Sequence, residues 1–209
     1  DILLHENNEV EDLRPYIDPN RRVKSANEIQ YMKEAASIAS SAHEKAMRNT
    51  RPGMGEWEIQ SLVEGHFMSS RSQWSFPSII GGGDNATVLH YKNNNQVINS
   101  GDLVLVDAGC EVSGYASDIT RTWPVNGRFS QPQREIYNLV LKAELAGIEA
   151  CQPGMPWVSM HEAVCVTIAE GLIELGVLDC TLEDALGRVA GKPGVFEGQI
   201  RNFFMHGTG

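Results

Sequence analysis

The amino-acid sequence predicts an α+β fold with one sizeable core. Residues 25–70 and the residues after Ser130 carry apolar side chains at helical spacing, whereas residues 75–122 consist of short apolar runs separated by Gly, Asn and Asp. The strands therefore form one block between two blocks of helices, and this order favours an α+β architecture over alternating βαβ units. With 209 residues, 42% of them apolar, the chain is long enough to bury a core of domain size.

Residues 1–24 are predicted to be a linker. They are polar, Pro15 and Pro19 interrupt them, and no helical or strand periodicity is sustained there. We therefore expect regular structure to begin at Ser25.

Two helices are predicted after this segment. Ser25 and Glu28 have the spacing of a capping box, and helical periodicity continues to about Arg48. The apolar positions of this helix are Ile29, Met32, Ala36, Ala39 and His43. A second helix is expected from about Glu56, with one apolar stripe formed by Ile59, Leu62, Val63, His66 and Phe67. Such a stripe packs on a flat layer, for which the following strands are the candidate.

The strand block and the last helices follow from short runs and capping signals. Strands are predicted at Ile79-Ile80, Thr87-Val88-Leu89 and Leu103-Val104-Leu105-Val106. Helices return after Ser130, which can cap the first of them, and after Ser159, which repeats the capping-box spacing with Glu162. Gly176 is expected to end the last of these helices.

Composition excludes several classes of function. The 17 Lys and Arg stand against 27 Asp and Glu, a net charge of −10, and no basic run is longer than Arg21-Arg22, so a nucleic-acid partner is not expected. No apolar stretch is long enough to span a membrane, and the first residues lack the pattern of a signal peptide. The four cysteines are scattered without a CxxC pair, which favours reduced thiols and a cytoplasmic location.

Asp107 and Asp118 are the sharpest candidates for chemistry. If an antiparallel hairpin turns at Val112-Ser113, the two aspartates lie directly opposite each other on one face, with Cβ atoms ~5 Å apart. Carboxylates this close repel each other unless a cation lies between them, and oxygen ligands suit a divalent ion such as Mn²⁺. The alternative is structural: Asp107 forms a local hydrogen bond in a turn, and Asp118 pairs with Arg121 or Arg22.

Four motifs give the sequence a family resemblance: Leu-His-Tyr at 89–91, Val-Asp-Ala-Gly at 106–109, Ser-Asp-Ile-Thr-Arg-Thr-Trp-Pro at 117–124 and Met-His-Gly-Thr-Gly at 205–209. In this order they resemble the aminopeptidase P (Xaa-Pro aminopeptidase) branch of the pita-bread metallopeptidases. The resemblance implies a pita-bread fold and two metal ions, usually Mn²⁺, with Co or Zn as alternatives. It also implies that Asp107 ligates one ion with both oxygens and that Asp118 bridges the two ions.

The same resemblance implies roles for two histidines. His90 would face the substrate and donate to the developing oxyanion, and His206 would act similarly at the edge of the substrate pocket. The family's other metal ligands, one histidine and two glutamates, lie further toward the C-terminus than Gly209. We therefore expect a catalytic domain over 25–209 that is incomplete at its C-terminus, preceded in 1–24 by a linker or the remnant of an N-terminal domain.

The implied activity is hydrolysis of the peptide bond between an N-terminal residue and a following proline, with an inactive fragment in this chain itself. The family also allows a homo-oligomer and a mitochondrial location. Three other functions stay open: a non-catalytic pita-bread module that binds peptides or proteins, a prolidase acting on Xaa-Pro dipeptides, and a creatinase. The metal-free creatinase site does not need paired aspartates, so Asp107 and Asp118 count against it.

Overall fold

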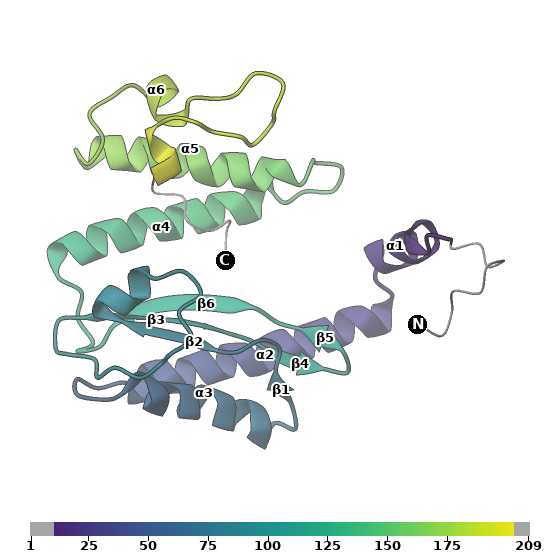
Figure 1. The fold of residues 1–209 in the computed structure, drawn as a ribbon, viewed down its shortest axis with the longest axis vertical. Coiled ribbons are helices and arrows are strands. Elements are labelled where there is room, and N and C mark those ends of the chain that lie inside the picture. The colour runs from purple at the N-terminus through teal and green to yellow at the C-terminus, as the bar shows by residue number, and fades with distance from the viewer. Residues whose placement is uncertain (1–10, 203–209) are drawn as a thin grey trace, which may run out of the picture.

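The computed structural model of the chain describes residues 11–202 and confirms the predicted α+β class. Its first block is helical, with α1 (Arg14–Arg22), α2 (Ala26–Asn49) and α3 (Glu56–Ser69). The strand block contains β1 (Gln73–Trp74), β2 (Ile79–Gly82), β3 (Leu103–Ala108), β4 (Cys110–Val112), β5 (Tyr115–Ala116) and β6 (Ile119–Pro124), with the 3₁₀ helix η1 (Gly83–Thr87) after β2. The last block contains α4 (Gln131–Ala150), α5 (Val158–Glu174), α6 (Leu182–Leu186) and the 3₁₀ helix η2 (Gln199–Asn202) (Figure 1).

Helix α1 corrects the expectation that regular structure begins only at Ser25. Pro15 occupies the first turn, where a missing N–H removes no helical hydrogen bond, and Arg21 and Arg22 lie in the last turn, where cations are favoured. None of its residues is buried, and it lies outside the layers formed by the other elements (Figure 1). Local sequence signals therefore favour this helix, although the two prolines led to the prediction of a linker. The division into domains at residue 24 stays a prediction.

Helix α2 begins with the predicted capping box. Glu28 N–H donates to Ser25 Oγ (3.3 Å), and Ser25 N–H donates to Glu28 Oε2 (2.6 Å). The buried face differs from the predicted stripe, because Ile29, Met32 and Ala36 are exposed. The residues that are buried are Ala35, Ala39, Ala42, His43 and Ala46. Small alanines let the helix approach the strands closely, so size and not hydrophobicity alone selected the packed face.

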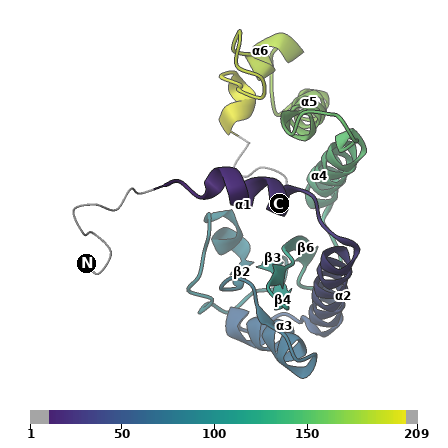
Figure 2. The same ribbon diagram turned by 90° about the vertical axis from the view of Figure 1, so that its right-hand side faces the viewer.

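Helix α3 buries three residues of the predicted stripe fully, whereas Leu62 and His66 are only partly buried. Ile59, Val63 and Phe67 are between 0% and 1% exposed and join α2 and the strands in one apolar cluster. Figure 2 shows α2 and α3 packed beside the strands, with α4, α5 and α6 stacked beyond them.

The strands form two three-stranded antiparallel sheets, ordered β2-β3-β6 and β1-β4-β5. Along β3, Val104, Val106 and Ala108 are buried in the cluster with α2 and α3, whereas the alternate residues are only half-buried. Asp107 is one of these alternate residues, so its side chain lies on the sheet face opposite that cluster.

The predicted strand at Thr87-Val88-Leu89 is wrong. Thr87 ends η1, and residues 88–90 form a bend and turn. Val88 and Leu89 are 53% and 47% exposed, and Thr87 Oγ1 donates to the carbonyl of Asp84 (2.7 Å). The run is short and pairs with no strand in the described part of the chain, so local turn contacts decide its conformation.

Helices α4 and α5 pack together and form a second apolar cluster with α6 and η2. Ser130 caps α4 in a capping box with Gln133, as predicted. The predicted capping box of Ser159 with Glu162 is wrong, because α5 already begins at Val158 and the Glu162 carboxylate accepts a hydrogen bond from Gly194 N–H (3.0 Å) instead. The Glu162 side chain thus binds a loop that is distant in sequence and does not cap the helix.

Across residues 11–202, none of the helices combines the length and the apolar character that a membrane crossing requires.

Candidate metal centre

The strand register places Thr120, not Asp118, directly opposite Asp107. The predicted register was wrong by two residues, because the hairpin turns at Ser113 and Gly114, which have φ values of 52° and 85°. Two residues are one full repeat of a strand, so Asp118 falls on the same face as Asp107, one diagonal step away. The turn at Ser113 and Gly114 thus sets the register, and the period of the strand keeps the two carboxylates on one face.

Beside these aspartates, the two strands of the hairpin approach each other closely at Gly109, Cys110 and Ser117. This close approach, the pinch, separates the two sheets. Ser117 N–H donates to the carbonyl of Cys110 (2.8 Å), and Ser117 Oγ accepts from Cys110 N–H (3.0 Å). Ser75 completes the pinch: its N–H donates to the carbonyl of Gly109 (2.9 Å) and its Oγ donates to that of Ser117 (2.8 Å). Asp118 directly follows this pinch, which fixes the end of β6 relative to β3.

The carboxylate of Asp107 lies in an unfavourable environment for its charge. Burial first, and then the negative charge of Asp118, raise the pKa of Asp107 to about 6, while the hydroxyl of Thr120 and the charge of His90 act in the opposite direction. Its Oδ1 is buried and has no hydrogen-bond partner among the residues that the structure describes. A half-buried carboxylate with a free oxygen and a second carboxylate beside it is an arrangement that a divalent cation would stabilise.

Asp118 faces a cavity of about 370 Å³ between β6 and α4. Its side chain is exposed, and the cavity walls also include Thr120, Ile148 and Met160. The guanidinium of Arg121 pairs with Glu144 of α4 (3.4 Å). Arg121 therefore has another acidic partner than Asp118, which weakens the structural alternative for that aspartate.

His90 lies in the turn that follows η1, with a φ of 53° and an exposed side chain. The charge of His90 lowers the pKa of Asp107, which indicates that this turn lies in the region of the aspartates although His90 precedes Asp107 by 17 positions. A positive φ is uncommon for a residue with a Cβ and needs surrounding contacts to hold it.

The structure describes only part of the predicted site. His206 lies outside residues 11–202. Within those residues, no group of three or more His, Cys, Asp or Glu side chains is arranged to hold a metal ion. Asp107 and Asp118 are thus a pair, to which further ligands would have to be added from elsewhere.

Sequence reasoning missed the residues that shape this pair. Thr120 stands opposite Asp107, and Gly109 allows the pinch, because a Cβ there would lie 1.8 Å from the carbonyl oxygen of Ser117. The glycine that follows Asp107 by two residues was a signal for such a close approach.

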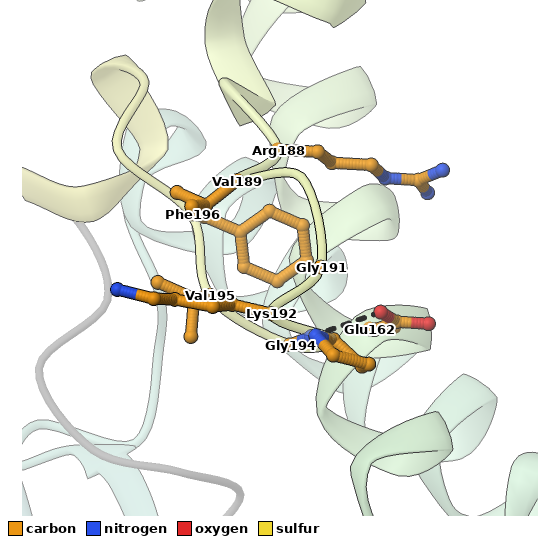
Figure 3. A pocket seen from close by; sticks show the side chains of 9 residues that line it. Glu162, Arg188, Val189, Gly191, Lys192, Gly194, Val195 and Phe196 are labelled. Atoms are coloured by element: carbon orange, nitrogen blue, oxygen red, sulfur yellow. Dashed lines mark hydrogen bonds between the residues drawn. The ribbon is translucent and has the colours of Figure 1, made fainter.

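A second cavity, of about 210 Å³, lies between α5 and the loop from Arg188 to Phe196 (Figure 3). Figure 3 shows Glu162 bonded to the loop at Gly194, while the side chains of Arg188 and Lys192 extend in opposite directions. The two cations do not converge on one point, and His90, Asp107 and Asp118, the predicted site residues that the structure describes, do not line this cavity.

Comparison with known proteins gives concordant results. A family model described as metallopeptidase family M24 matches residues 30–209. The Xaa-Pro aminopeptidase of Haemophilus influenzae is 44% identical over 202 residues, which are 96% of this chain and 45% of that protein. The structure of Pseudomonas aeruginosa aminopeptidase PepP has a TM-score of 0.81 and 42% identity over 82% of this chain and 39% of that one. A zinc-substituted Escherichia coli aminopeptidase P in complex with product has a TM-score of 0.80, 39% identity and the same two coverages. The chain thus spans less than half the length of these relatives.

Proposed function

This chain belongs to metallopeptidase family M24, in its aminopeptidase P branch and with its pita-bread fold, and from that membership we propose that the full-length protein is an Xaa-Pro aminopeptidase. The proposed reaction is hydrolysis of the peptide bond between an N-terminal residue and a following proline. The observation that carries the proposal is the carboxylate pair, in which a buried oxygen of Asp107 has no hydrogen-bond partner within residues 11–202 and lies beside the like charge of Asp118.

The pair fits part of a site for two divalent cations. Asp107 would ligate one ion with both oxygens and Asp118 would bridge the two, because Asp118 directly precedes β6 and the strand period assigns it to the face of Asp107. All-oxygen ligands suit Mn²⁺, and Co or Zn are the alternatives. When bound, such a pair of ions supplies an activated water and charge stabilisation for amide hydrolysis.

The chain's own residues would orient the substrate around that pair. His90 would donate a hydrogen bond to the oxyanion that develops at the scissile carbonyl, and His206 would donate at the edge of the substrate pocket. Thr120, whose hydroxyl lowers the pKa of Asp107, would keep that carboxylate ionised and directed toward the ions. The Arg121–Glu144 pair would hold α4 beside β6 and so maintain the cavity that Asp118 faces.

The proposal is tested with the full-length protein and two peptides, Ala-Pro-Ala and Ala-Ala-Ala. We expect release of alanine from the first peptide only, loss of that activity after treatment with EDTA, and its return on addition of Mn²⁺. Absence of hydrolysis with every divalent ion would favour a non-catalytic binding module instead. Cleavage of the dipeptide Ala-Pro with no cleavage of the tripeptide would favour a prolidase.

The proposed compartment is the cytoplasm, with the mitochondrion as the alternative. All four cysteines are free: Cys110, Cys151, Cys165 and Cys180. Free thiols at every cysteine support a reducing compartment. The proposed partner is the peptide substrate, and a homo-oligomer of the full-length protein is proposed from the family resemblance; light scattering of the purified protein tests the latter.

A further inference from the structure

The loop of residues 83–96, which carries His90, is held to the rest of the fold by hydrogen bonds to one buried carboxylate, that of Glu56. Glu56 is the first residue of α3 and is 0% exposed. Four groups donate hydrogen bonds to its two oxygens at 2.8 to 3.0 Å: the backbone N–H groups of Gly82 and Gln96, the Nδ2 of Asn85 and the hydroxyl of Tyr91. An ionised carboxylate only accepts hydrogen bonds, so this set of four donors suits it.

These contacts close the loop at both ends. Gly82 ends β2 and directly precedes the loop, and Gln96 is the last residue of the loop, so the carboxylate joins the two ends of the loop. The backbone of Glu56 adds to this closure, since its N–H donates to the carbonyl of Gln96 (2.9 Å). Removing such a carboxylate would leave several buried donors without an acceptor.

Tyr91 connects this anchor to the histidine, because it directly follows His90 in the chain. Its side chain is only 9% exposed, and its hydroxyl contacts Asn85 (3.0 Å) as well as Glu56 (2.8 Å). Burial, together with the hydrogen bond to Glu56, raises the pKa of the Tyr91 phenol, so the hydroxyl remains a donor. With Tyr91 held in this way, the positive φ of His90 is maintained by its neighbour.

A second contact keeps the loop attached independently of Glu56. The side chain of Asn94 accepts from Ile80 N–H (3.0 Å) and donates to the carbonyl of Ser78 (2.8 Å). Because Asn94 ties the loop to β2, loss of the Tyr91 hydroxyl alone should loosen the turn without detaching the whole loop.

We propose that Glu56 and Tyr91 are positioning residues, which act on the reaction only by holding the turn that carries His90. The inference rests on the proposed function, since it assigns a task to the turn at His90 in peptide hydrolysis. Neither Glu56 nor Tyr91 needs to touch substrate, because both are buried.

The test is a double-mutant cycle in the full-length protein, assayed on Ala-Pro-Ala. We expect Tyr91→Phe to lower kcat/KM by roughly 10- to 100-fold, the range for misplacing a catalytic group, and to leave the metal content unchanged. In a His90→Ala background the same change should have no further effect, because the residue through which it acts is gone. Hydrogen–deuterium exchange of residues 83–96 should be faster in Tyr91→Phe than in the unmodified protein.

Tyr115→Phe is the matched control. It removes a hydrogen bond from a tyrosine hydroxyl to a glutamate at the same 2.8 Å distance, to Glu28 at the start of α2, and it should leave kcat/KM unchanged. Glu56→Gln is the stronger variant, because its amide would turn a donor toward other donors; if it does not fold, Tyr91→Phe carries the test.

Two results would overturn the inference while leaving the proposed function intact: a loss in Tyr91→Phe that adds fully to that of His90→Ala, or unchanged exchange of residues 83–96. A full-length protein that cleaves no Xaa-Pro peptide would instead overturn the proposed function and, with it, the role of the anchor in catalysis.

Discussion

The α-carbon of Gly109 and the carbonyl oxygen of Ser117 approach each other so closely that a Cβ on Gly109 would lie 1.8 Å from that oxygen. The contact lies where the two sheets separate, two residues after Asp107 of β3 and directly before Asp118, which precedes β6. The geometry of the carboxylate pair therefore depends on a residue without a side chain.

Gly109→Ala should lower the free energy of unfolding by about 3 kcal/mol, the upper range for forcing an extra carbon into a packed site. Gly65→Ala is the matched control: Gly65 lies within α3, a Cβ there meets nothing within 4 Å, and the change should stabilise the helix by about 0.5–1 kcal/mol. Urea denaturation measures both changes. Equal effects of the two substitutions would show that the pinch is not a tight contact.

Asp118→Asn in the full-length protein should lower kcat by at least about 10²-fold, because even residues that only support metal ligands cause losses of that size. The bound metal, measured by inductively coupled plasma mass spectrometry, should fall as well. Asp179→Asn is the control, since Asp179 is exposed in the segment between α5 and α6. Normal metal content and kcat in Asp118→Asn would exclude the bridging role.

Ser113→Asn should stabilise the hairpin. Ser113 and Gly114 both have positive φ values, and asparagine adopts this region more readily than serine. We expect a gain of roughly 0.5 kcal/mol, a part of the ~1–2 kcal/mol penalty for the left-handed conformation. Ser113→Val should destabilise the protein, because a branched Cβ opposes this conformation. A lower melting temperature for Ser113→Asn would contradict the observed turn.

The capping box of α2 should make stability depend on pH. The hydrogen bonds from Ser25 and from the Tyr115 hydroxyl lower the pKa of Glu28 from 4.5 to about 2. Because the folded pKa is the lower one, this contribution to stability is complete above pH 4.5 and is lost as the pH falls toward 2. NMR titration of the Glu28 carboxyl measures the pKa directly.

Glu28→Gln removes the titrating group but keeps an acceptor for the Ser25 N–H. The difference in unfolding free energy between Glu28→Gln and the unmodified protein should therefore shrink as the pH falls from 4.5 to 2. Glu34→Gln, at an exposed position of the same helix, should show no such convergence. A difference for Glu28→Gln that stays constant over this interval would contradict the low pKa.

The order of the three blocks, helices, strands and helices again, and two of the helix starts could be predicted from the sequence. Ser25 and Ser130 cap their helices as predicted, because a capping box is complete within four consecutive residues. The stripe of α3 was readable for a similar reason, since Ile59, Val63 and Phe67 repeat at the helical period. The motifs around Asp107 and Asp118 likewise gave the family, which the comparisons support.

Three features that depend on a partner distant in sequence could not be predicted from local patterns. The Glu162 carboxylate accepts a hydrogen bond from Gly194 N–H and does not cap a helix as predicted. The run Thr87-Val88-Leu89 pairs with no strand within residues 11–202. Helix α2 packs closely on the strands through its alanines, whereas Ile29 and Met32, which were predicted to be buried, are exposed. Sequence spacing reports local periodicity, but it does not report what lies across the interface.

Both sequence spacing and the packing of the folded chain shape the site. Spacing was enough to put Asp107 and Asp118 on one face, because the strand period is two and an error of two residues leaves the face unchanged. Spacing could not reveal that Thr120 stands opposite Asp107, that Gly109 allows the pinch, or that Glu56 holds the turn of His90. These contacts join residues up to 40 positions apart, as between Glu56 and Gln96, and only the packing of the folded chain brings them together.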